Sequence, residues 1–121
     1  MKNVAESGPM LPHGMTKEEK NAVIEFRQRL LDKYPKEIHA VELFGSKARG
    51  DFYKESDMDI LIIVKQRTPE LDDYIIDLVC DILNLKGVYL ETVTYTDKEF
   101  QEAERLQHPF AINIAREAVV V

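Results

Sequence analysis

The chain has 121 residues, of which 45% are hydrophobic and 31% charged, a composition typical of one soluble globular domain. A net charge of −6 argues against a broad basic surface for nucleic acid, and no apolar run approaches the ~18 residues of a membrane-spanning helix. The single Cys80 excludes an internal disulfide, so we predict a cytoplasmic protein without a membrane segment.

The N-terminal part predicts a leader followed by a charged helix. Residues 1–15 contain Gly, Pro and Met without periodicity, which indicates a flexible leader before a single domain over 16–121. Thr16 and Glu19 form the pattern of a capping box, and apolar residues then recur at helical spacing. The next segment, IHAVELFGS, predicts a short strand that breaks at Gly45.

The middle of the chain predicts a strand, a helix and a second strand. DMDILIIV (57–64) is polar at its start and apolar on both faces thereafter, which is typical of a central strand covered on both sides. Pro69 begins a long helix with a broad apolar face, and Gly87 is its expected C-terminal cap. Cys80 lies near that face, so we expect a small core residue there. VYLETVTYT (88–96) is rich in β-branched and aromatic residues and predicts another strand.

The C-terminal part predicts two short helices. Thr96 and Glu99 form a second capping box before KEFQEAERL, and PFAINIARE and the apolar tail AVVV follow. The order helix, strand, strand, helix, strand, helix, helix predicts an α/β (α+β) fold, with a small mixed β-sheet flanked by helices.

Two carboxylates interrupt the most apolar strand. Asp57 and Asp59 are two residues apart, so their side chains leave the same face of a strand, with Cα atoms roughly 6.6 Å apart. Such a pair can converge on one Mg²⁺ or hold two ions. Carboxylate oxygens suit Mg²⁺ or Mn²⁺ rather than zinc. Met58 should point to the opposite face, into the core.

A Gly-Ser turn with cations precedes these carboxylates. Gly45 allows a phosphate to approach the backbone, and the following amides and the Ser46 hydroxyl can donate to its oxygens. Lys47 and Arg49 add positive charge nearby. Each signal alone has a simpler interpretation, because a D-x-D pair is common and a Gly-Ser pair is usually a turn. Together they favour in-line transfer of a nucleotide from a nucleoside triphosphate, which needs phosphate donors beside metal-binding carboxylates.

The arrangement of these residues resembles a known family. Gly45-Ser46, ten intervening residues and Asp57-x-Asp59 resemble the G-S-x10-D-x-D signature of DNA polymerase β-like nucleotidyltransferases. The run FGSKARGDFYKESDMDILIIV is similar to the minimal nucleotidyltransferase (MNT) family, and HPFAINIARE resembles the tail of one of its branches. The resemblance implies a polymerase β-like nucleotidyltransferase fold. It also implies Mg²⁺-dependent transfer of a nucleoside monophosphate to a hydroxyl acceptor. The expected group is AMP, with ATP or another NTP as the donor.

The resemblance also implies roles for single residues. Ser46 and its neighbouring amides would contact phosphates, and Asp57 and Asp59 would bind metal. The family usually adds a third acid, an Asp, on a later strand, where it polarises the acceptor. Glu91 is the only acid in the matching strand, so it is the candidate for this catalytic and metal-binding position. A solvated residue at the edge of the sheet is the alternative interpretation of Glu91.

The resemblance implies a partner as well. Minimal nucleotidyltransferases are commonly paired with a HEPN-domain protein, often an RNase toxin, and in some pairs the MntA-type antitoxin transfers AMP to it. Two alternatives stay open: a non-catalytic antitoxin that acts by binding alone, and a nucleotide-binding module. A further possibility is a homo-oligomer in which a second copy of the chain completes the site.

Overall fold

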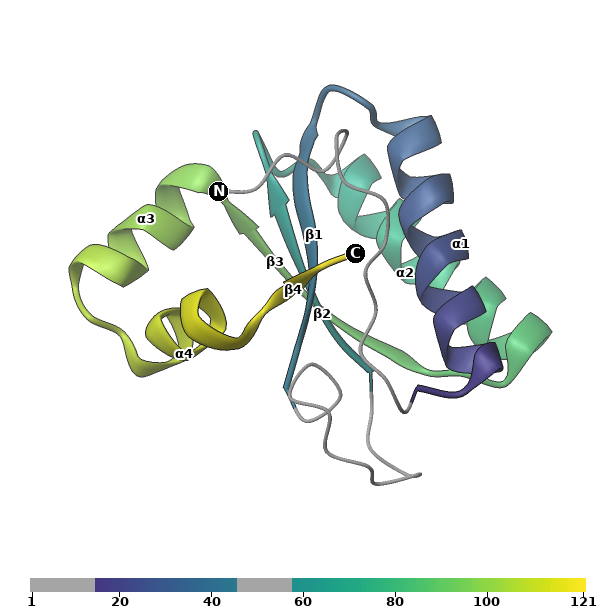
Figure 1. The fold of residues 1–121 in the computed structure, drawn as a ribbon. Helices are drawn as coiled ribbons and strands as arrows, with labels where there is room; N and C mark the ends of the chain where they lie inside the picture. Colours follow the sequence, from purple (N-terminus) through teal and green to yellow (C-terminus); the bar gives the residue numbers. More distant parts are fainter. Residues whose placement is uncertain (1–14, 46–57) are drawn as a thin grey trace.

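The structure, a computed structural model, describes residues 15–45 and 58–121 and shows a sheet between two pairs of helices (Figure 1). The elements are α1 (Lys17–Lys33), β1 (Ile38–Phe44), β2 (Met58–Val64), α2 (Pro69–Lys86), β3 (Leu90–Thr96), α3 (Asp97–Arg105), α4 (Pro109–Glu117) and β4 (Val119–Val120). Residues 1–14 and 46–57 lie outside the described parts, so the leader predicted over 1–15 stays a prediction.

The sheet has four described strands in the order β3-β2-β1-β4. β2 pairs antiparallel with β1 and parallel with β3, and β4 pairs antiparallel with β1. The C-terminal end of β1 and the N-terminal ends of β2 and β3 therefore meet at one end of the sheet, here called the site end, which is the lower end in Figure 1. This mixed sheet confirms the predicted fold class. Strand β4 was not among the predicted elements.

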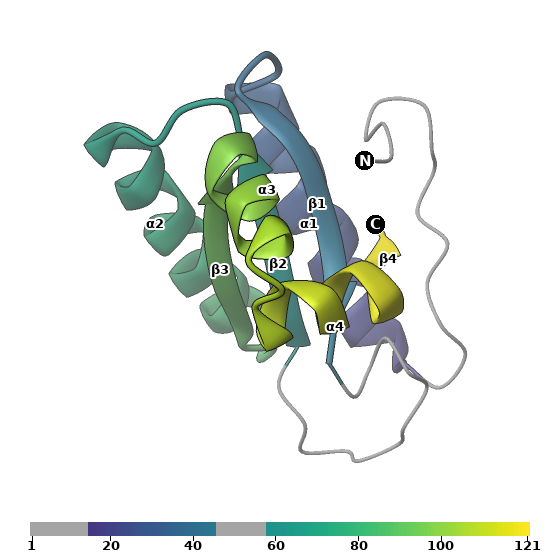
Figure 2. The ribbon, with the colours of Figure 1, turned by 90° about the vertical axis from the view of Figure 1, so that its left-hand side faces the viewer.

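Each face of the sheet is covered by one pair of helices. Helices α1 and α2 lie on one face, and α3 and α4 lie on the other (Figures 1 and 2). The core on the α1/α2 side includes Phe26, Leu30, Met58, Ile60, Ile62, Leu78 and Ile82. The core on the α3/α4 side is smaller and contains Ala40, Leu61, Ile63, Phe100, Ala111 and Ile114. Strand β2 contributes to both cores and lies between β1 and β3, so its prediction as a doubly covered central strand is confirmed.

The predicted helix termini agree with the structure. The amide of Glu19 donates to Thr16 Oγ1 over 3.1 Å and the amide of Thr16 donates to Glu19 Oε1 over 2.9 Å. Thr96 and Glu99 form the same reciprocal pair at 3.0 and 3.1 Å. Gly87 ends α2 in the left-handed conformation, at φ 70°. Each box satisfies two amides that the first helical turn leaves without partners.

The prediction for Cys80 was wrong, because this side chain is exposed. The residues of α2 that face the sheet are Leu71, Ile75, Leu78 and Ile82. Cys80 belongs instead to a second apolar stripe with Ile76 and Leu83, which are 60% and 41% exposed. Helical periodicity alone does not show which of two adjacent apolar stripes faces the sheet.

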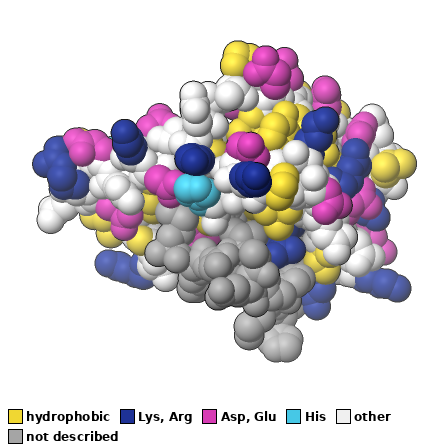
Figure 3. All heavy atoms as spheres, turned by 90° about the horizontal axis from the view of Figure 1, so that it is seen from above, with side chains coloured by type: hydrophobic (Ala, Val, Ile, Leu, Met, Phe, Trp, Pro, Cys, Tyr) yellow, Lys and Arg dark blue, Asp and Glu magenta, His cyan; other side chains and the backbone are white. Residues whose placement is uncertain are grey.

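The surface carries charges of both signs. Figure 3 views the molecule from the end opposite the site end, and Lys, Arg, Asp and Glu side chains are interspersed on that face. Across the residues that the structure describes, no helix combines the length and the apolar character needed to cross a membrane.

Candidate active site

Gly45 lies against the carboxylate of Asp59 at the site end. It directly follows β1 and has φ 79°. Residues other than glycine rarely adopt this left-handed backbone conformation. A Cβ placed on Gly45 would collide with Oδ2 of Asp59 and lie 3.2 Å from its Cγ. A glycine at this position thus serves two purposes: it permits the turn, and it leaves room for the carboxylate beside the backbone.

Three residues form a row across neighbouring strands. Phe44 of β1 is the register partner of Asp59 in β2, and Asp59 is the register partner of Glu91 in β3. Register partners point to the same face of a sheet, and adjacent strands lie about 4.8 Å apart. Asp59 and Glu91 therefore occupy adjacent positions on one face of the sheet at the site end, Asp59 half-buried and Glu91 exposed.

Strand alternation explains which face the row occupies. Met58 and Ile60, on either side of Asp59, are buried in the core on the α1/α2 side, as predicted for Met58. Leu90 is buried in that core as well, so Asp59 and Glu91 point to the α3/α4 side. Glu91 therefore lies on the same face of the sheet as Asp59, while its catalytic and metal-binding role stays a prediction.

The other predicted site residues lie outside the described parts of the chain. These are Ser46, Lys47, Arg49 and Asp57. Within residues 15–45 and 58–121, no three His, Cys, Asp or Glu side chains form a group that could hold a metal ion. Asp59 and Glu91 supply two of the three predicted carboxylates. Their oxygens are ligands that Mg²⁺ and Mn²⁺ prefer, and the space that a Gly45 Cβ would fill lies directly beside one of them.

An aromatic cluster lies on the same face as the acids. Phe44 contacts Phe110 of α4 edge-on, with ring centroids 5.6 Å apart. Tyr95 lies 5.8 Å from Phe100 of α3 and 6.1 Å from Phe110. Aromatic pairs of this kind contribute about 0.5–1.5 kcal/mol each. The cluster holds α3 and α4 on the sheet beside the row of Phe44, Asp59 and Glu91.

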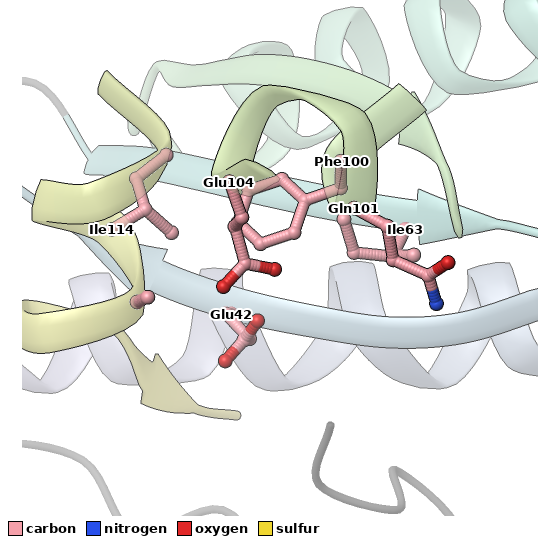
Figure 4. Close-up of a pocket in the computed structure, with 7 residues that line it drawn as sticks. Glu42, Ile63, Phe100, Gln101, Glu104 and Ile114 are labelled. Carbon is pink, nitrogen blue, oxygen red and sulfur yellow. The ribbon is translucent and has the colours of Figure 1, made fainter. Parts of the chain in front are cut away.

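A hollow between these helices and the sheet was not predicted from the sequence. It is lined by Glu42, Ile63, Phe100, Gln101, Glu104, Ile114 and Ala115 (Figure 4). Glu42 is the one charged residue in the otherwise apolar strand sequence AVELF. Its position indicates a polar side chain on a mostly covered face of the sheet. Glu104 is one of several charged residues of α3 and gave no signal of its own.

Comparisons with known proteins point to one chemistry. A family model described as a nucleotidyltransferase domain matches residues 23–121. A protein of Methanocaldococcus jannaschii is 36% identical over 104 residues, which cover 85% of this chain and 97% of that protein. It carries the provisional name protein adenylyltransferase.

Solved structures share the fold. A toxin–antitoxin crystallised with AMP-PNP is similar with a TM-score of 0.53 and 16% identity, over 87% of this chain and 72% of that one. A mutant of the toxin–antitoxin MntA-HpeT is similar with a TM-score of 0.52 and 14% identity, over 88% and 72%.

Proposed function

Because the chain belongs to the nucleotidyltransferase domain family and is therefore a nucleotidyltransferase, we propose that it transfers AMP from ATP to a hydroxyl group of another protein. The name of the relative that is 36% identical supports both an adenylyl donor and a protein acceptor. The observation that carries the proposal is that Asp59 and Glu91 are register partners on neighbouring strands. Gly45 lies beside Asp59, at a position where any side chain would collide with the Asp59 carboxylate.

The donor set suits a hard divalent cation. We propose that Asp59 and Glu91, together with Asp57, hold Mg²⁺ or Mn²⁺. The bound ions would neutralise charge on the triphosphate and lower the pKa of the acceptor hydroxyl. Asp59 is half-buried and lies against Gly45, so its carboxylate is positioned before ligands arrive.

The remaining residues would bind and orient the reactants. Gly45 lets a phosphate approach the backbone, with Ser46 as a hydroxyl donor and Lys47 and Arg49 as nearby positive charges. The acceptor oxygen attacks the α-phosphorus of ATP, and the bond from that phosphorus to the oxygen of the leaving pyrophosphate breaks. The exposed Glu91 would orient the acceptor hydroxyl and take its proton.

We propose a HEPN-domain protein as the acceptor, with this chain as an MntA-type antitoxin. Two structures of similar fold are toxin–antitoxins, and at their low identity this likeness supports the fold rather than the pairing.

The test is transfer of label from ATP. The purified chain is incubated with Mg²⁺, a HEPN-domain protein encoded beside it, and ATP labelled at either the α- or the γ-phosphate. We expect the HEPN protein to gain α-label and no γ-label, and the label to be absent with EDTA or with Asp59→Asn. A stable complex without any transfer would contradict the proposal and favour an antitoxin that acts by binding alone.

A further inference from the structure

The outer edge of β3 is a long strand edge without the usual protection. β3 lies at one end of the strand order, and all its residues pair with β2 without a register shift. Among the described residues no strand pairs with its other side, so a row of backbone N–H and C=O groups lacks a strand partner there. Proteins usually protect such an edge with lysine, proline, a bulge or a very short strand. The sequence LETVTYT has seven residues and none of these features.

An apolar stripe on α2 lies beside this edge. The stripe consists of Ile76, Cys80 and Leu83 at helical spacing, with Ile76 60% and Leu83 41% exposed and Cys80 exposed as well. The nearly opposite side of α2 faces α1, where the Tyr74 hydroxyl donates to the carbonyl of Arg29 over 3.1 Å. The stripe therefore faces away from α1, toward the end of the sheet that β3 forms (Figure 2).

A second hollow connects the stripe with the strand edge. Ile76 lines this hollow together with Thr92 and Thr94 of β3. Ile62 of β2 is the register partner of Thr94 and is fully buried. The hollow is therefore closed toward β2 and opens at the outer edge of β3. A strand added to β3 would border it directly.

Two copies of β3 complement each other in one antiparallel register. Residues that face each other in an antiparallel pair point to the same face of the sheet, so a two-fold pairing is centred on a residue. A pairing centred on Val93 uses the whole strand and places Thr92 opposite Thr94. It places Glu91, the only charged residue of β3, opposite Tyr95. Pairs of β-branched and aromatic residues stabilise a sheet, and in this register no like charges face each other.

The same two-fold axis brings the α2 stripes of both copies together. Ile76 lies at the level of Thr92 and Thr94, close to the axis, so the two Ile76 side chains would meet there. The charged residues that line the hollow, Arg67 and Asp72, already pair with each other over 3.5 Å. They therefore add no net charge that would repel a second copy.

The surface is large enough for a stable dimer. β3 lies between α2 on one side and α3 on the other (Figures 1 and 2). At the usual strand rise and layer spacing this strip is roughly 23 Å by 30 Å, or roughly 1,400 Å² for both copies together. Stable protein–protein interfaces bury about 1,200–2,000 Å² in total.

We propose that the chain forms a homodimer in which β3 pairs antiparallel with β3 of a second copy and the α2 stripes pack on each other. The two four-stranded sheets become one continuous sheet. Because Tyr95 of the second copy faces Glu91 in this register, each copy also borders the candidate active site of the other. The dimer does not depend on the proposed function, since it forms without ATP, metal or acceptor.

The first test is a cross-linking experiment that determines the register. In full-length chains with Cys80→Ser, Val93→Cys should give a disulfide-linked dimer under mild oxidation, since the Cα atoms of facing residues lie about 4.5–5.5 Å apart. Thr92→Cys alone and Thr94→Cys alone should give none, because each residue lies about 7–8 Å from its own copy. A mixture of these two variants should cross-link, because Thr92 faces Thr94.

The second test measures the dimer Kd of the full chain by sedimentation equilibrium without ATP or metal. Ile76→Lys should raise Kd about thirtyfold, because each dimer loses two isoleucine side chains from its interface. Leu85→Lys is the matched control. Leu85 is 72% exposed on the same helix, half a turn around the axis from Ile76, so its Kd should stay unchanged.

Three results would overturn the inference: a monomer at concentrations up to ~1 mM, equal Kd values for Ile76→Lys and Leu85→Lys, or a dimer that Val93→Cys does not cross-link. A monomer whose β3 amides become protected from hydrogen exchange only when a HEPN-domain protein is added would also overturn it. That result would assign the strand edge to a different protein.

Discussion

Replacing Gly45 with alanine tests whether the backbone and the Asp59 carboxylate are packed as described. An alanine in the left-handed conformation costs about 1–2 kcal/mol. Its methyl group would also displace the Asp59 carboxylate, and an off-rotamer side chain costs about 0.5–1.5 kcal/mol more. We expect a loss of about 2–3 kcal/mol in the free energy of unfolding, measured by urea denaturation. Transfer of α-label should fall about a hundredfold, because a small displacement of a positioned group is enough.

Gly87 is the matched control for this change. It has φ 70°, close to the 79° of Gly45, but nothing lies within 4 Å of its added Cβ. Gly87→Ala should therefore cost only about 1–2 kcal/mol of backbone strain and leave transfer unchanged. In an Asp59→Ala background the difference between the two glycine variants should disappear. Equal losses at both glycines in the unmodified chain, or full transfer by Gly45→Ala, would refute the packing argument.

Three further changes test other parts of the structure. Asp59→Asn should abolish transfer, because the amide cannot replace the carboxylate as a ligand for Mg²⁺; retained transfer with Mg²⁺ would contradict the metal assignment. Glu91→Gln should lower kcat strongly while ATP and Mg²⁺ together still raise the melting temperature, since the residue acts on the acceptor; unchanged kcat would place Glu91 outside the reaction. Thr96→Ala removes the α3 capping box and should lower the free energy of unfolding, measured by urea denaturation, by about 1 kcal/mol. An unchanged denaturation midpoint would show that the cap does not stabilise the fold.

Much of the fold could be predicted from the sequence because its signals are local. The continuous apolar run of 60–64 predicted a central strand, and Thr16, Thr96 and Gly87 predicted helix termini. Strand β4 could not be predicted, because two valines form a strand only where β1 offers them an edge. Cys80 was misplaced for a similar reason: the stripe of α2 that covers the sheet is decided by tertiary packing.

The candidate site could likewise be predicted only in part from the sequence. Gly45, Asp59 and Glu91 were selected from motif and resemblance, and the structure adds that the two acids are register neighbours. The sequence did not indicate the hollow, because Glu42 and Glu104 come from β1 and α3 and meet only when both helices of that side pack on the sheet. Ser46, Lys47, Arg49 and Asp57 stay predictions.

The parallel pairing of β2 with β3 has a consequence for the order of folding. Phe44 and Asp59 are brought together by the antiparallel pairing of consecutive strands, whereas Glu91 reaches Asp59 only through the crossover that contains α2. Closing the longer loop loses more chain entropy before its contacts form. We therefore expect the two carboxylates to meet late in folding. A ligand that needs both carboxylates would therefore bind chains with a complete sheet and would not bind chains in which only β1 and β2 have paired.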